Sequence, residues 1–137
     1  MTLKLSDNGN CFACGAKNPI GLHLQFRQDG EDYCTEFTPT ENHQGFTGIT
    51  HGGILTTLLD EAMGSCLWAH DIPAVTAQLK VNLRNPAHIG ETLRVRARIR
   101  NEHGRLIYCL ADAARTDGTL VASAEGTFIR VSVSPTE

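Results

Sequence analysis

A single stretch of helical character, from Gly53 to about Ala69, constrains the fold more than any other feature of this sequence. Its apolar residues recur at the three- and four-residue spacing of one helix face. At about 100° per residue, this stripe covers more than half of the helix circumference. We therefore expect a long helix that is buried over most of its surface. The apolar residues are Ile54, Leu55, Leu58, Leu59, Ala62, Met63, Cys66 and Leu67.

The other regular segments are typical of β-strands, because each has alternating or continuous apolar residues between turn signals. Two flank the turn Asp29-Gly30, and four follow the helix, where the breaks include the hairpin signals His103-Gly104 and Asp117-Gly118. No second helix is evident to cover the other face of a sheet. The pattern predicts an α+β fold, a curved antiparallel β-sheet wrapped around one long central helix, with the last four strands as a meander. The expected strands are residues 22–27, 32–37, 75–84, 92–100, 106–115 and 120–133.

The chain length predicts one domain over residues 1–137, large enough to bury a core without disulfides. Residues 1–22 are rich in Asn, Gly, Asp and Cys and contain Asn18-Pro19 and Gly21, so we expect an irregular N-terminal arm.

The charge balance argues against nucleic acid and anionic membranes as partners. Lys and Arg total 12 against 15 Asp and Glu, a formal net charge of -3. The N-terminus does not resemble a signal peptide, and no apolar run approaches the roughly 20 residues that span a bilayer. We expect a cytoplasmic protein that acts on a small molecule, with its five cysteines reduced.

The turn His51-Gly52-Gly53 runs directly into the expected helix. The first N–H groups of a helix have no intrahelical partner and carry a partial positive charge. A glycine-rich turn at this point can therefore hold a carbonyl oxygen or an anion. Alternatively, the two glycines serve only to form a tight turn, and the His51 ring serves only local backbone groups.

Two carboxylates, Asp60 and Glu61, follow about two turns into the helix. Asp60 lies at the border of the apolar face, beside Thr57 and Gly64, whose small size leaves room for a ligand or another backbone. Glu61 points about 100° away, so the two carboxylates should not share one task. We expect Asp60 to be the functional group and Glu61 to be structural. In the alternative, Glu61 is the base and Asp60 is a solvated helix carboxylate.

Cys11 and Cys14 have the spacing of half a zinc knuckle, because two thiolates so placed can bind one metal ion. A closed site needs two further ligands. We favour packing of the arm over metal binding for this pair, and we expect no metal or other cofactor. Cys66 and Cys109 are best interpreted as small core residues. The candidates for the further ligands are Cys34, His23, His43 and His51.

Six motifs together resemble the hotdog-fold acyl-CoA thioesterases of the phenylacetate-pathway (PaaI-like) type. They extend over nearly the whole chain. The position of His-Gly-Gly nine residues before an acidic residue on the helix is more specific than the triplet alone. The motifs are Cys11-Phe12-Ala13-Cys14-Gly15, Asn18-Pro19-Ile20-Gly21-Leu22, His43-Gln44-Gly45-Phe46, His51-Gly52-Gly53, Asp60-Glu61-Ala62-Met63-Gly64 and Leu79-Lys80-Val81-Asn82-Leu83-Arg84-Asn85-Pro86.

This resemblance implies a homodimer, or a dimer of such dimers as a homotetramer, whose sheets join edge to edge with two active sites at the interface. The family's catalytic carboxylate corresponds to Asp60, and its oxyanion-binding N–H corresponds to Gly52 of the other subunit, with His51 beside it. A positioning hydroxyl corresponds to Thr76, and a contributing amide to Gln44, where this loop is one residue longer. An ordinary strand threonine is the alternative for Thr76.

The implied reaction is hydrolysis of an acyl-CoA or related thioester to the free acid and thiol. Gly52 N–H would stabilise the oxyanion, and Asp60 would act as general base or as nucleophile. Lys80, Arg84 and Arg130 are candidates for contacts to the CoA phosphates. We expect substrate contacts from the residues around the turn and the carboxylates, namely Gly53, Thr57, Glu61 and Gly64.

Two other functions fit the same pattern. A non-catalytic protein that binds acyl-CoA or an acyl carrier would keep the pocket without turnover. A hotdog dehydratase or hydratase would need a His and an acid poised at a β-carbon, and the His-x-x-x-x-Pro-Gly signature of such enzymes is absent from this sequence.

Overall fold

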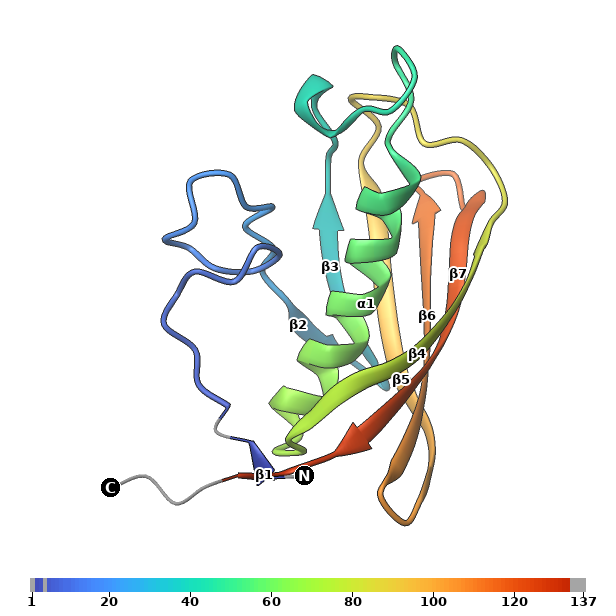
Figure 1. Cartoon of the computed structure of the whole chain (residues 1–137). Helices are drawn as coiled ribbons and strands as arrows, with labels where there is room; N and C mark the ends of the chain where they lie inside the picture. Colours follow the sequence, from blue (N-terminus) through green and yellow to red (C-terminus); the bar gives the residue numbers. More distant parts are fainter. Residues whose placement is uncertain (1, 4, 134–137) are drawn as a thin grey trace.

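A computed structural model describes residues 2–3 and 5–133 of the chain (Figure 1). One α-helix lies against a large antiparallel sheet, and a short parallel pair of strands joins the two ends of the described chain. None of the helices in this part of the chain is long and apolar enough to cross a bilayer. In chain order the elements are β1 (Thr2–Leu3), β2 (Arg27–Asp29), β3 (Asp32–Phe37), the 3₁₀ helix η1 (Glu41–His43), α1 (Gly52–Ala69), β4 (Ala74–Leu83), β5 (Leu93–His103), β6 (Leu106–Arg115), β7 (Leu120–Arg130) and β8 (Ser132–Val133).

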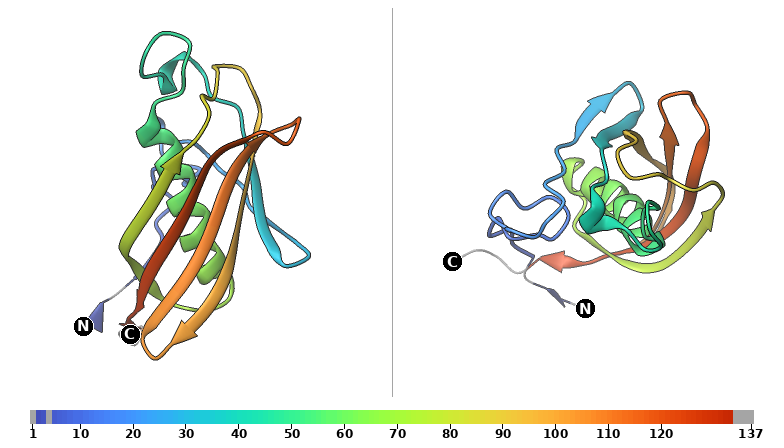
Figure 2. Two further views of the ribbon diagram at one scale, coloured as in Figure 1. Left: turned by 90° about the vertical axis from the view of Figure 1, so that its right-hand side faces the viewer. Right: turned by 90° about the horizontal axis from the view of Figure 1, so that it is seen from above.

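The large sheet has six strands in the order β2-β3-β5-β6-β7-β4, and every pairing in it is antiparallel. It curves around α1, as the view along the helix shows (Figure 2). Within the described residues strand β4 pairs with β7 alone, so its other edge presents unpaired backbone groups. The expected α+β architecture, one helix wrapped by a curved antiparallel sheet, is confirmed.

Helix α1 is buried because its wide apolar stripe faces the concave side of the sheet. Leu58, Leu59, Ala62 and Met63 each have 0% of their surface exposed. The helix and the sheet pack closely at Gly126 on β7, where an added Cβ would lie 2.9 Å from the Met63 sulfur. The strands contribute the other half of the core, chiefly Leu93, Val95, Ile107, Val121 and Phe128.

The N-terminal arm covers the side of α1 that the sheet leaves open (Figure 1). Leu22 and Leu24 alternate inward as the sequence pattern predicts, and both are buried. However, their N–H groups donate to the carbonyls of Phe12 and Ala13, both at 2.9 Å, and not to a strand. The strand expected at residues 22–27 is therefore wrong except at its last residue, because the alternation reports burial and not the backbone partner.

The expected four-strand meander also needs correction. Strands β5, β6 and β7 form it, but β4 pairs with β7 at the far edge. The hairpin signals of the sequence lie between β5 and β6 and between β6 and β7, whereas the connection from β4 to β5 is a longer loop. In the N-terminal arm, residues 5–22 form no helix or strand, whereas Thr2–Leu3 form β1, which pairs in parallel with β8.

We expect Leu58→Ala to lower the free energy of unfolding by about 2 to 5 kcal/mol, because it leaves a cavity between α1 and the sheet. Ile20→Ala is the control, since that side chain is 77% exposed and should change stability little. Urea unfolding of both variants and the wild type checks this. Equal midpoints for Leu58→Ala and the wild type would contradict the burial of α1.

Candidate active site

The start of α1 is arranged so that one backbone N–H is left available. His51 is the N-cap residue, and its Nδ1 accepts a hydrogen bond from Gly53 N–H at 2.8 Å. Its carbonyl accepts from Ile54 N–H at 2.9 Å. The Gly52 N–H has no acceptor among the described residues. Because Nδ1 is an acceptor, the neutral ring carries its proton on Nε2, a second donor beside Gly52.

A cavity of about 550 Å³ opens beside this helix start. His51 and Gly52 line it together with Phe46, Leu83 and Arg84. Phe46 is 87% exposed and Leu83 57%, so two large apolar side chains form an exposed rim. Of the three cations considered for phosphate contacts, Arg84 is the one that lines this cavity, whereas Arg130 is paired with Glu102.

Asp60 and Thr76 form a hydrogen-bonded pair. The Thr76 hydroxyl donates to Asp60 Oδ1 at 2.8 Å, which joins α1 to the edge strand β4. Asp60 is half-buried, and the bond leaves its Oδ2 available. Neither residue lines the cavity at Gly52. Asp60 and Thr76, both proposed from the resemblance, are thus in contact with each other, and they lie at the edge strand of the sheet.

Gly52 and Asp60 cannot act on the same atom from within one chain. Eight residues separate them on α1, and at about 1.5 Å per residue they lie about 12 Å apart along the helix axis. A donor and a base must each approach a reacting carbonyl to about 3 Å. The two groups of one chain are therefore too far apart to act together on one carbonyl.

The loop before the helix positions the remaining candidate, Gln44. Its Oε1 accepts from Gly48 N–H at 3.0 Å, which closes the loop and leaves the amide NH₂ as the group that can reach a ligand. Nearby, His43 Nδ1 accepts from Thr40 N–H at 2.9 Å, and burial lowers the pKa of His43.

Thr50, which the sequence reasoning missed, also lines the cavity. It is 4% exposed, and its hydroxyl has no hydrogen-bond partner in the described part of the chain. An unpaired buried hydroxyl costs roughly 1 to 3 kcal/mol, so a ligand or water that bonds to it would be favoured. Nothing in the sequence around a threonine that precedes His-Gly-Gly indicates that its hydroxyl is buried without a partner.

The other proposed contact residues lie elsewhere. The Thr57 hydroxyl donates to Gly53 carbonyl at 2.9 Å, within the helix. Gly64 and Glu61 line a different cavity, of about 570 Å³, on the side of α1 that faces the arm. Glu61 accepts from Cys11 and from Ser65 there, so it does not join Asp60.

The cysteines divide into two kinds of environment. Burial raises the pKa of Cys66, and it raises the pKa of Cys109 to about 12, which fits core residues that are not nucleophiles. Burial and the neighbouring Glu61 carboxylate raise the pKa of Cys14. Cys34 is fully buried on the sheet, away from the arm.

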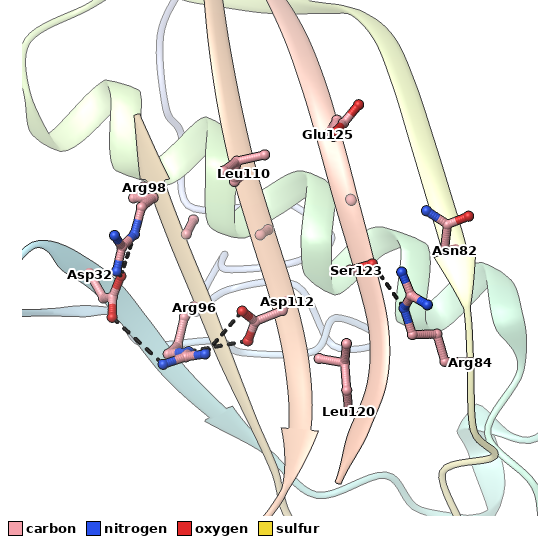
Figure 3. A pocket seen from close by; sticks show the side chains of 13 residues that line it. Asp32, Asn82, Arg84, Arg96, Arg98, Leu110, Asp112, Leu120, Ser123 and Glu125 are labelled. Atoms are coloured by element: carbon pink, nitrogen blue, oxygen red, sulfur yellow. Dashed lines mark hydrogen bonds and ion pairs between the residues drawn. The ribbon is translucent and has the colours of Figure 1, made fainter. Parts of the chain in front are cut away.

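A further concavity on the convex face of the sheet is filled with charges that pair with one another (Figure 3). Arg96 binds Asp112 through two hydrogen bonds of 3.1 and 3.0 Å, and Arg98 binds Asp32 at 2.7 Å. Because these cations already have carboxylate partners, this concavity is a poor anion site. Arg84, at its edge, instead contacts the Ser123 hydroxyl at 3.4 Å.

One long buried helix wrapped by a curved six-stranded antiparallel sheet is the arrangement of the hotdog fold. Over residues 47–122, just over half of the chain, the sequence matches the family described as the thioesterase superfamily. The chain belongs to this superfamily, which confirms the family expected from the motifs.

Two curated relatives are acyl-CoA thioesterases by name. The bovine protein acyl-coenzyme A thioesterase THEM4 is 29% identical over 89 residues, 64% of this chain and 36% of the bovine protein. Mouse acyl-coenzyme A thioesterase 13 is 28% identical over 100 residues, 71% of each protein. The chain therefore spans only about a third of the bovine relative.

Solved structures show the same fold. A crystal structure of a thioesterase superfamily protein superimposes with a TM-score of 0.83 at 25% identity, covering 88% of this chain and 60% of the other. The PaaI protein of the E. coli phenylacetic acid degradation operon has a TM-score of 0.74 at 21% identity, covering 80% and 84%. The chain therefore shares its fold with PaaI.

We expect His51→Ala to lower the free energy of unfolding by about 0.5 to 2 kcal/mol, because Gly53 N–H loses its capping acceptor. His51→Asn is the matched control, since an asparagine oxygen at the N-cap replaces that acceptor and should keep the wild-type stability. Chemical denaturation of the three proteins measures the difference. If alanine and asparagine had the same effect, the ring would not be the cap.

Proposed function

We propose that this protein is a thioesterase that hydrolyses an acyl-CoA, or a related acyl thioester, to the free acid and thiol. The observation that carries the proposal is the Asp60–Thr76 pair at the free sheet edge, together with the unoccupied Gly52 N–H at the helix start. Membership of the thioesterase superfamily and the named relatives support the same reaction class.

The site we propose is shared between two copies of the chain. Strand β4 has Thr76 near its beginning and Leu83, which faces Gly52, at its end. Two such edge strands related by a two-fold axis pair antiparallel, so the beginning of one lies opposite the end of the other. This pairing brings Asp60 and Thr76 of one subunit to the Gly52 cavity of its partner, and it covers exposed Leu83.

In this arrangement the thioester carbonyl accepts from Gly52 N–H, with His51 Nε2–H as the neighbouring donor. Asp60, oriented by Thr76, either removes a proton from the attacking water or attacks the acyl carbon to form an anhydride that water then cleaves. The oxyanion formed in the first step is stabilised by the fixed N–H. Its collapse breaks the carbon–sulfur bond and releases the thiolate, which takes up a proton.

The cavity beside Gly52 suits the other part of such a substrate. Its apolar rim of Phe46 and Leu83 can cover an acyl chain or pantetheine arm, and Arg84 offers a cation that has no carboxylate partner among the described residues. We propose Arg84 as a contact for the CoA phosphates. The protein needs no other cofactor for this reaction, since CoA enters as part of the substrate.

Asp60→Asn should lower kcat for acyl-CoA hydrolysis by about 10² to 10⁴, the scale of a lost general base. Thr76→Ala should lower it by about ten- to a hundredfold, the scale of a hydrogen bond to a charged group, while Thr76→Ser retains the bond. The control is Asp71→Asn, which neutralises an exposed carboxylate just past the end of α1.

A panel of short, long and aromatic acyl-CoAs, followed by free-thiol release, measures these rates. Wild-type activity no higher than that of Asp60→Asn would reject the enzyme and leave a non-catalytic acyl-CoA binding protein. A larger loss in Glu61→Gln than in Asp60→Asn would assign the base to Glu61 instead.

Gly52→Pro tests the oxyanion donor and the shared site. Proline lacks an N–H but is tolerated at the first helical position, and His51 has the extended backbone (φ -61°, ψ 134°) that proline requires before it. We expect an activity loss of about 10² to 10³. Gly52→Ala keeps the N–H and meets the same Leu83 tip, so it should stay near the wild type.

Mixing the inactive Gly52→Pro and Asp60→Asn proteins should then restore activity, because each mixed dimer has one intact site. With random exchange of subunits, roughly a quarter of the wild-type activity should return. If subunit exchange is confirmed and no activity returns, the site is not made by two subunits. A fully active monomer in size-exclusion chromatography with light scattering would contradict the shared site as well.

A further inference from the structure

Outside the proposed active site, three potential metal ligands converge where the N-terminal arm meets α1. The ligand atoms of Cys11, Cys14 and Glu61 all lie within 4.8 Å of one another. Cys11 Sγ lies 3.8 Å from Glu61 Oε1, although 50 residues separate the two positions in the chain. The cluster is thus a product of the fold and not of sequence spacing alone.

The arm is shaped so that both sulfurs face the helix. Gly15 N–H donates to the Cys11 carbonyl at 2.8 Å, which closes a tight turn around Cys14. A Cβ at Gly15 would lie 2.4 Å from the Cys11 nitrogen and 2.5 Å from the Gly9 oxygen, so no other residue fits there without moving the backbone. The bonds from Leu22 and Leu24 to the arm then fasten this turn to the core.

Glu61 is held in place for a ligand role. The Ser65 hydroxyl, one helical turn further along α1, donates to Glu61 Oε1 at 3.0 Å. Among the described residues, no Lys or Arg forms an ion pair with this carboxylate. A hydrogen bond such as the one from Ser65 fixes the orientation of a carboxylate that binds a metal. Two thiols and a carboxylate therefore lie together, and no Lys or Arg among the described residues neutralises the charge of the carboxylate.

We propose that Cys11, Cys14 and Glu61 bind one zinc ion, with the fourth coordination position open to solvent. Thiolates select zinc over magnesium or calcium, which prefer oxygen ligands. Zinc bonds of about 2.0 to 2.3 Å place tetrahedral ligand atoms about 3.3 to 3.8 Å apart. The Cys11 Sγ–Glu61 Oε1 separation of 3.8 Å already lies in this range, and the other ligand atoms, all within 4.8 Å of one another, need to move closer by at most about 1.5 Å. The adjoining cavity of about 570 Å³, lined in part by Asn10, Ser65 and Trp68, leaves room for a bound water.

Zinc here would join the arm to the helix residue next to Asp60. The site lies where α1 faces the arm, on a different face of the helix from the Asp60–Thr76 pair, and it takes no part in the proposed hydrolysis. Its existence therefore does not depend on the thioesterase proposal. Since both thiols must lose their protons to bind the ion, binding should release protons and stabilise the arm.

The test is calorimetric titration of the full chain with zinc sulfate alone, after reduction and removal of metal by a chelator. We expect one zinc per chain, with a binding enthalpy that depends on the buffer because protons are released. Ser65→Ala should weaken binding by roughly 10- to 100-fold, as loss of an outer partner does. Cys11→Ser, Cys14→Ser and Glu61→Gln should weaken it more.

Cys34→Ala is the matched control, because that cysteine is buried in β3 and should leave zinc affinity unchanged. Cobalt substitution provides a second readout, since thiolate ligands give charge-transfer absorption that the serine variants should lose, and circular dichroism confirms that each variant is folded. Failure of the reduced wild type to bind stoichiometric zinc would overturn the proposal. So would binding that persists in both serine variants or after oxidation of the cysteine pair to a disulfide.

Discussion

The burial of α1 within the concave face of the sheet is the constraint on which the rest of this structure depends. A helix that is apolar over more than half of its circumference must be covered on several sides. The sheet covers one side, where Phe128 and Met63 both lie close to Gly126, and the N-terminal arm covers another. The sheet and the arm leave a strip of α1 beside the edge strand β4, where we propose that a second chain pairs.

This packing separates two neighbouring carboxylates into different chemistry. Asp60 and Glu61 differ by about 100° around the axis, so the orientation of α1 between the sheet edge and the arm decides both environments. Asp60 meets the hydroxyl of Thr76, whereas Glu61 meets Cys11 and Ser65. One helix thereby supports a proposed hydrolytic site and a proposed metal site without either using the other's residues.

Much of the fold could be predicted from the sequence, because local patterns determine it. The helix begins one residue earlier than expected, at Gly52, and the strands after it lie within a few residues of their expected ranges. Backbone partners were predicted less well. The alternation around Leu24 indicated burial but not pairing with Ala13, and β4 pairs with β7 although no turn signal links them. Such pairing depends on chain segments that are distant in sequence.

The sequence by itself determined the long buried helix, the glycine turn at its start and the phase that separates Asp60 from Glu61, since each follows from periodicity and local backbone preference. Only the tertiary structure decided that Thr76 bonds to Asp60, that Thr50 lies unpaired in the cavity, and that the carboxylate beside the two arm cysteines is Glu61. Contacts of this kind arise when the core closes, because that step brings β4 and the arm against different faces of one helix.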